Sequence, residues 1–140
     1  MRKKRNVTIC VSWPYANNNL HLGYIASSLS GDILARYHRM VGDDVLMVSG
    51  TDCHGTKPEI KAKQEGVTPK DIVDRYDANF RKALKVFNFS YDIFAKTYDE
   101  FHKEKCMEMF KRLYDNGYLY EKVVKRPYCE HCGKFVNDTE

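Results

Sequence analysis

Two short polar segments carry the residue types best suited to chemistry. The first, residues 14–24 (PYANNNLHLGY), has three consecutive asparagines followed by His21 and Gly23. A histidine in the first turn of a helix can donate to a phosphate oxygen, because unpaired backbone N–H groups there attract anions. Gly23 lets a ligand approach the backbone closely. The alternative is a histidine that only hydrogen-bonds to the backbone at the helix start.

The second segment, residues 50–55 (GTDCHG), places Asp52 between two glycines. A carboxylate at the bottom of a cleft suits a cationic group such as an ammonium. Asp52 is equally suited to cap the helix that follows. Cys53 and His54 are metal-ligand types, but adjacent residues at one strand end cannot both chelate comfortably, so we expect no metal there.

The elements on either side of these segments should bring them together. Apolar, β-rich runs at residues 7–12 and 44–49 directly precede the two segments and predict buried strands. An amphipathic helix is predicted between them at residues 20–41, ended by Gly42. Its apolar positions recur at helical spacing: Ile25, Leu29, Ile33, Tyr37 and Met40. Strand, helix and strand form a right-handed βαβ unit, whose ligands bind beyond the carboxyl ends of the strands.

Further helices complete an α/β, Rossmann-like fold with a parallel sheet. A short helix is predicted at residues 59–64, ended by Gly66, and another opens with Thr68 as N-cap, Pro69 at N1 and Asp71 at N3. Residues 90–96 are a strand or an extended connection. A last helix begins near residue 97, ends at Gly117, and should bury Phe101, Met109, Phe110 and Leu113. We predict domains at residues 1–118 and 119–140, the second starting a zinc-knuckle insertion.

Composition limits the function classes. The 140 residues carry a net charge of +4, which permits an anionic partner without requiring one. Neither a P-loop nor a G-x-G-x-x-G fingerprint is present. No apolar run is long enough to span a bilayer, and no signal peptide follows the basic start. Cys10 and Cys106 fall in apolar runs and are expected to be reduced core thiols, which predicts a cytoplasmic protein.

The two segments resemble a known family. The tetrapeptide HLGY at residues 21–24, after PYAN, resembles the HIGH signature of class I aminoacyl-tRNA synthetases, and GTDCHG resembles their second strand-end motif. Other stretches are similar to methionyl-tRNA synthetases: GVTP at 66–69, FSYD at 89–92 with Thr97, NGY at 116–118, and YCEHCGKF at 128–135 with Asp138. The resemblance covers nearly all of the chain after the basic tail.

The resemblance implies activation of methionine by ATP with Mg²⁺ and transfer of the acyl group to tRNA(Met). The implied catalytic residues are His21 and Tyr24. The implied ATP-binding residues are Tyr15, His21, Gly23 and Tyr24. The implied methionine-binding residues are Ser12, Trp13, Tyr15 and Asp52, with Asp52 taking the ammonium group.

The chain also departs from the family pattern. Tyr24 replaces the second histidine of the signature, and a phenol cannot become cationic near neutral pH. Trp13 replaces a smaller residue, and no lysine-rich KMSKS-type loop is present, so we expect weak binding and poor activity from this chain alone. Cys129 and Cys132 form half of a zinc site, and Zn²⁺ is expected in a longer parent protein. The alternative function is a non-catalytic synthetase-like paralogue that binds a nucleotide or an amino acid.

Overall fold

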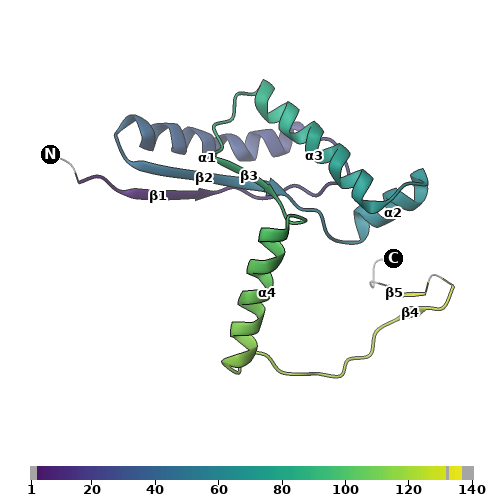
Figure 1. Ribbon diagram of the computed structural model, residues 1–140. Helices are drawn as coiled ribbons and strands as arrows, with labels where there is room; N and C mark the ends of the chain where they lie inside the picture. The colour runs from purple at the N-terminus through teal and green to yellow at the C-terminus, as the bar shows by residue number, and fades with distance from the viewer. Residues whose placement is uncertain (1–2, 132, 137–140) are drawn as a thin grey trace. The chain divides into compact units, whose positions relative to one another are not determined.

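The computed structural model describes residues 3–131 and 133–136, arranged as five strands and four helices within those ranges (Figure 1). In chain order the elements are β1 (Asn6–Cys10), α1 (Leu22–Met40), β2 (Asp44–Thr51), α2 (Thr56–Glu65), α3 (Pro69–Val86), β3 (Ile93–Lys96), α4 (Glu100–Asp115), β4 (Tyr128–Cys129) and β5 (Lys134–Phe135). Two compact units divide between Lys105 and Cys106.

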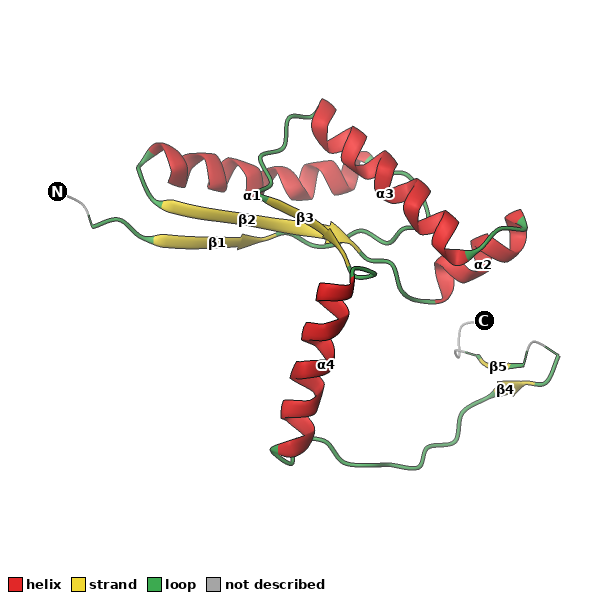
Figure 2. Ribbon diagram, viewed as in Figure 1, coloured by secondary structure: helices red, strands yellow, loops and turns green. Residues whose placement is uncertain are grey.

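A three-stranded parallel sheet forms the centre of the first unit. Its order is β1-β2-β3, with Thr8 opposite Leu46 and Val48 opposite Ile93. Helices α1 and α3 cover the same face of this sheet (Figure 2). The predicted βαβ unit and the α/β class are therefore confirmed, and the carboxyl ends of β1 and β2 lie at one edge, as the shared-site argument requires.

Local sequence signals account for the helix boundaries around α3. The Thr68 side chain accepts a hydrogen bond from the Asp71 backbone N–H, and the Asp71 carboxylate accepts one from the Thr68 N–H at 2.9 Å. This capping box satisfies two donors that a helix start leaves unpaired. Helix α2 ends at Gly66 in the left-handed conformation, at φ 66°, where a glycine avoids the steric cost of a Cβ. Both predicted boundaries are confirmed.

The buried face of α1 differs from the prediction. Its buried residues are Ser28, Asp32 and Ala35, whereas four residues of the predicted apolar face are exposed: Leu29, Ile33, Tyr37 and Met40. The close approach of helix to strand explains this choice, because a Cβ added to Gly31 would lie 2.8 Å from Cγ2 of Val11. Only small side chains fit at that distance, so size outweighs hydrophobicity on this face of the helix.

Two further burial predictions are wrong. Helix α4 has no buried residue, and Phe101, Met109, Phe110 and Leu113 are all exposed. Cys106 on α4 is exposed for the same reason. Cys10 is exposed because strand residues alternate between faces: its neighbour Ile9 packs toward Ala35 of α1, which turns Cys10 to the other face.

The second unit contains the β4–β5 hairpin, in which Tyr128 pairs with Phe135 and their rings meet edge to face at 5.2 Å. Within the described ranges, no helix combines the length and the apolar character that crossing a membrane requires.

Candidate nucleotide and amino-acid site

The two polar segments meet through their backbones. The Asp52 N–H donates to the Pro14 carbonyl at 2.9 Å, and the Ala16 N–H donates to the Asp52 carbonyl at 3.0 Å. These bonds make a parallel bridge between Tyr15 and Asp52, beyond the regular ends of β1 and β2. The expected juxtaposition of the segments is therefore present.

His21 caps the N-terminus of α1. Its Nδ1 accepts a hydrogen bond from the Tyr24 backbone N–H at 3.3 Å, as the backbone-bonding alternative predicted. Because Nδ1 supplies a lone pair to this bond, the neutral ring carries its proton on Nε2. A Cβ at Gly23 would approach this ring to 3.0 Å, so the glycine leaves room for the cap. The capped ring thus presents an N–H donor beside the positive end of a helix.

A cleft of about 330 Å³ opens beside His21. Pro14, Tyr15, Leu20, Tyr24, Lys57 and Phe80 are among its lining residues, together with the three asparagines. This volume is in the range of small-molecule sites. Lys57, from the first turn of α2, places its ammonium 5.2 Å from the centroid of the Tyr15 ring and adds a positive charge that the sequence analysis missed. Its position two residues after GTDCHG was the available signal.

Asp52 is not a helix cap. The N-cap of α2 is Gly55, which makes no side-chain capping bond. The Asp52 carboxylate instead accepts a backbone N–H from His54 at 3.4 Å, and the residue remains partly exposed. The capping alternative is excluded for this helix, and the carboxylate stays at the edge of the sheet, where a cation can reach it.

Trp13 lies across the end of the sheet. A Cβ at Gly50 would lie 2.5 Å from Cζ3 of Trp13 and 2.4 Å from the carbonyl oxygen of Ala95. Glycine is therefore the residue that seats the indole against β2. The indole also approaches the His102 ring, with centroids 5.8 Å apart. No sequence pattern predicts this contact, since 89 positions separate the two residues.

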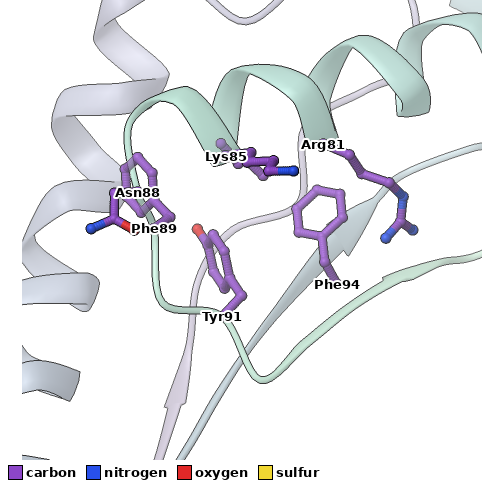
Figure 3. Close-up of a pocket in the computed structure, with 7 residues that line it drawn as sticks. Arg81, Lys85, Asn88, Phe89, Tyr91 and Phe94 are labelled. Carbon is purple, nitrogen blue, oxygen red and sulfur yellow. The ribbon is translucent and has the colours of Figure 1, made fainter.

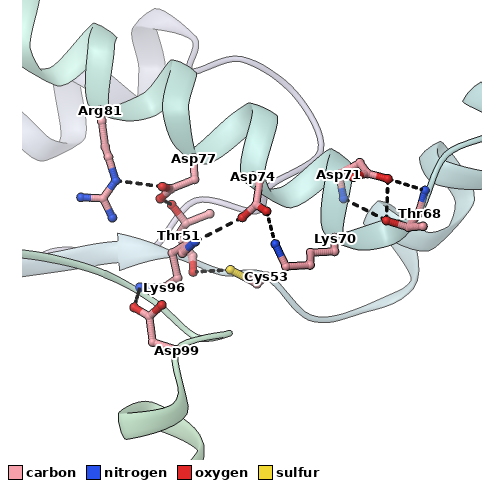
Figure 4. A network of polar contacts seen from close by, with 10 residues as sticks. All are labelled: Thr51, Cys53, Thr68, Lys70, Asp71, Asp74, Asp77, Arg81, Lys96 and Asp99. Carbon is pink, nitrogen blue, oxygen red and sulfur yellow. Dashed lines mark hydrogen bonds and ion pairs between the residues drawn. The ribbon is translucent and has the colours of Figure 1, made fainter.

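A polar network along α3 anchors the end of β2 (Figure 4). The Thr51 hydroxyl donates to Oδ1 of the buried Asp77 at 2.6 Å, and Nε of Arg81 donates to Oδ2 at 2.8 Å. Burial raises the pKa of the neighbouring Cys53 thiol, and its Sγ contacts the Thr51 carbonyl. Because the thiolate is the form that binds metal ions, this raised pKa disfavours metal binding by Cys53.

A second cavity of about 240 Å³ lies at the other end of α3 (Figure 3). It is lined by Arg81, Leu84, Lys85, Asn88, Phe89, Tyr91 and Phe94. The rings of Tyr91 and Phe94 rise from the segment around β3 toward Arg81 and Lys85, and the Arg81 guanidinium lies 5.1 Å from the Phe94 centroid. None of the predicted site residues lines this cavity.

The predicted half zinc site is only partly described. Cys129 lies on β4 and is half-buried, while Cys132 is outside the described residues. Within residues 3–131 and 133–136, no three histidine, cysteine or carboxylate side chains gather as a metal-binding group. The zinc site therefore stays a prediction.

Comparison with known proteins places this geometry in a family. The family described as "tRNA synthetases class I (M)" matches residues 7–140. A methionine–tRNA ligase of Bacillus mycoides is 52% identical over 127 residues, covering 91% of this chain and 23% of the relative. Methionine–tRNA ligase 1 of Alkaliphilus oremlandii is 46% identical over 133 residues, covering 95% and 25%.

A solved structure gives the same result. Mycobacterium tuberculosis methionyl-tRNA synthetase, in complex with methionyl-adenylate, superimposes with a TM-score of 0.85 at 26% identity, covering 97% of this chain and 27% of that one. The chain spans about a quarter of the length of these relatives. On the match across residues 7–140, the chain belongs to the class I tRNA synthetases of the methionine type.

Proposed function

We propose that this chain is the N-terminal catalytic portion of a methionyl-tRNA synthetase. In the reaction, a carboxylate oxygen of methionine attacks the α-phosphorus of ATP, the bond to the bridging oxygen breaks, and pyrophosphate leaves. The acyl group then passes to a ribose hydroxyl at the 3′ end of tRNA(Met), with AMP leaving. The observation that supports this most is the Tyr15–Asp52 bridge, which joins an ammonium-binding carboxylate to the segment that carries His21.

The residues take separate roles in this proposal. His21 donates from Nε2 to an ATP phosphate as negative charge builds on the phosphorus, and the N-terminus of α1 adds its dipole. Gly23 lies under the adenine, and Lys57 contributes charge on the phosphate side. The resemblance implied a catalytic role for Tyr24; its ring lines the cleft, while its hydroxyl donates to the Ser12 carbonyl oxygen. Mg²⁺, when bound, neutralises phosphate charge.

In this proposal methionine lies on the other side of the Tyr15–Asp52 bridge from ATP. Asp52 takes its ammonium group, since a charge-assisted hydrogen bond is stronger than a neutral one. Tyr15 lies between the two substrates, and Ser12 with Trp13 forms the wall of the amino-acid site. The seat of Trp13 on Gly50 supports this wall. We propose a cytoplasmic location, as for an enzyme that works on tRNA, and Zn²⁺ held by Cys129 and Cys132 in the complete protein.

Methionine-dependent exchange between ATP and pyrophosphate tests the proposal in the full-length enzyme. We expect exchange with methionine and none with isoleucine or valine. Exchange with either of those amino acids in place of methionine contradicts the substrate assignment. Titration calorimetry of the 140-residue chain with methionine and with ATP measures what this portion binds alone.

A second candidate function rests on Tyr24. Its hydroxyl is directed at a backbone carbonyl rather than into the cleft, which favours a paralogue that binds but does not adenylate. Binding of methionine or ATP without any exchange in the full-length protein supports this candidate over the first.

A further inference from the structure

The Tyr24 hydroxyl is engaged within the protein. It donates to the Ser12 carbonyl oxygen at 3.1 Å, and the Ser49 hydroxyl donates to the same oxygen at 3.2 Å. One carbonyl at the end of β1 is therefore held from two sides, by α1 through Tyr24 and by β2 through Ser49. This carbonyl belongs to the peptide bond between Ser12 and Trp13, so it lies next to the backbone that carries the indole.

Two more hydroxyls lie behind this pair. Ser28 is fully buried on α1, and neither its Oγ nor the buried hydroxyl oxygen of Tyr91 meets hydrogen-bond geometry with another described residue. Burial, followed by the approach of Tyr24, raises the pKa of Tyr91 well above its usual value of 10, although Ser28 and Ser49 act against the shift. Four hydroxyls thus converge beneath the start of α1. A buried hydroxyl without a hydrogen-bond partner lowers the stability of a protein core. We therefore expect these hydroxyls to have a structural role.

The phenol of Tyr24 has a single proton to donate. If it donates to an ATP phosphate, the Ser12 carbonyl loses that partner. If the Tyr24 hydroxyl keeps its hydrogen bond to the Ser12 carbonyl, it cannot donate one to the phosphate. The two roles exclude one another, and they predict effects on different kinetic constants.

We propose that Tyr24 is a positioning residue, which fixes the Ser12–Trp13 wall of the amino-acid site through the Ser12 carbonyl. The helix that begins with the His21 cap is thereby tied to the strand end that carries the wall. The hydrogen bond and its effect on Trp13 need no assumption about activity, whereas the name of the substrate rests on the function proposed above. In this arrangement Tyr24 positions the Ser12 carbonyl, whereas the histidine of the family signature is expected to contact phosphate.

Trp13 is the only tryptophan in the sequence and reports on its own position. Tyr24→Phe keeps the ring and removes the hydroxyl, so we expect a shifted emission maximum and greater acrylamide quenching of Trp13 in the 140-residue chain. Tyr37→Phe, at an exposed position of the same helix, is the matched control and should match the unsubstituted chain. Circular dichroism confirms that the variants fold. Emission and quenching unchanged in Tyr24→Phe overturn the proposal.

Kinetics of the full-length enzyme separate positioning from catalysis. Losing one neutral hydrogen bond should raise the KM for methionine about 2- to 10-fold in Tyr24→Phe, with kcat and the KM for ATP within about twofold. Ser49→Ala should move the methionine KM in the same direction. A fall in kcat with an unchanged methionine KM assigns the hydroxyl to the phosphates and overturns the proposal. Absence of exchange in the unsubstituted enzyme overturns the proposed function instead, and the fluorescence result still decides the role of the hydroxyl.

Discussion

His21 combines two tasks that a pair of substitutions can separate. Its Nδ1 caps α1, and the residue is exposed and lines the cleft, where Nε2–H is the proposed donor. His21→Ala removes both the cap and the donor. His21→Asn keeps a side-chain acceptor of the type most favoured at N-caps, but its short amide cannot place a donor where Nε2 lies.

The sizes of the two effects differ. Loss of an N-cap costs about 1 kcal/mol, and the 3.3 Å length of this bond puts His21 at the weaker end, near 0.5 kcal/mol. Loss of one preorganised donor to developing charge costs about 2–4 kcal/mol of transition-state stabilisation, or about 30- to 1000-fold in rate. We therefore expect the 140-residue chain with His21→Asn to be at least as stable as the unsubstituted chain. The full-length enzyme with the same substitution should lose most of its exchange activity.

Thermal unfolding of the 140-residue chain and pyrophosphate exchange by the full-length enzyme measure the two effects. His21→Ala should unfold a few degrees lower and lose activity to the same extent as His21→Asn. If His21→Asn exchanges at the unsubstituted rate, the Nε2 donor has no part in the mechanism. If His21→Ala unfolds at the same temperature as the unsubstituted chain, the ring does not stabilise α1 as a cap.

Three other substitutions test the surrounding structure. Burial alone would raise the pKa of Asp32, but hydrogen bonds from Arg36 and Ser90 outweigh it and hold the pKa in the folded protein below the ordinary value of 3.8. The ionised carboxylate therefore stabilises the fold at pH values above 3.8. This stabilisation is lost as the pH falls through the lower pKa of the folded protein. Asp32→Asn should lower the free energy of unfolding by about 2 kcal/mol at pH 7, and denaturant titrations should show the difference shrinking in acid; a difference independent of pH contradicts the ionic role. Gly50→Ala should cost about 1–3 kcal/mol or more by overpacking and change Trp13 emission; an unperturbed spectrum would place the indole elsewhere. Asp52→Asn should raise the methionine KM about 10- to 100-fold and leave the ATP KM unchanged, as initial-rate kinetics would measure; an effect on ATP alone would remove Asp52 from ammonium binding.

The sequence was sufficient for the parts of the fold that local patterns control. Alternation of strand, helix and strand placed residues 14–24 and 50–55 at one edge, and the capping signal at Thr68 was correct. The predicted roles of the site residues remain predictions, but their relative positions followed from the parallel sheet alone.

The rest depended on contacts between distant positions. Periodicity identified α1 as a helix, yet it could not show that the sheet approaches Gly31 too closely for leucine or isoleucine. The apolar pattern of α4 predicted a buried face, but no residue of this helix is buried among the described residues. The approach of Tyr24, Ser28 and Ser49 to Tyr91 joins α1, β2 and the connection before β3, and such hydroxyls resemble ordinary surface residues in a sequence.

The Tyr15–Asp52 bridge has a consequence for redesign of the proposed amino-acid site. Because main-chain atoms alone make the bridge, an exchange of the side chain at position 13 or 15 removes none of the hydrogen bonds that hold the Asp52 backbone. If Asp52 binds the α-amino group as proposed, libraries randomised at those two positions should keep that recognition while varying the space for the side chain of the amino acid. In the proposed full-length enzyme, this separation would suit directed evolution toward non-natural amino acids.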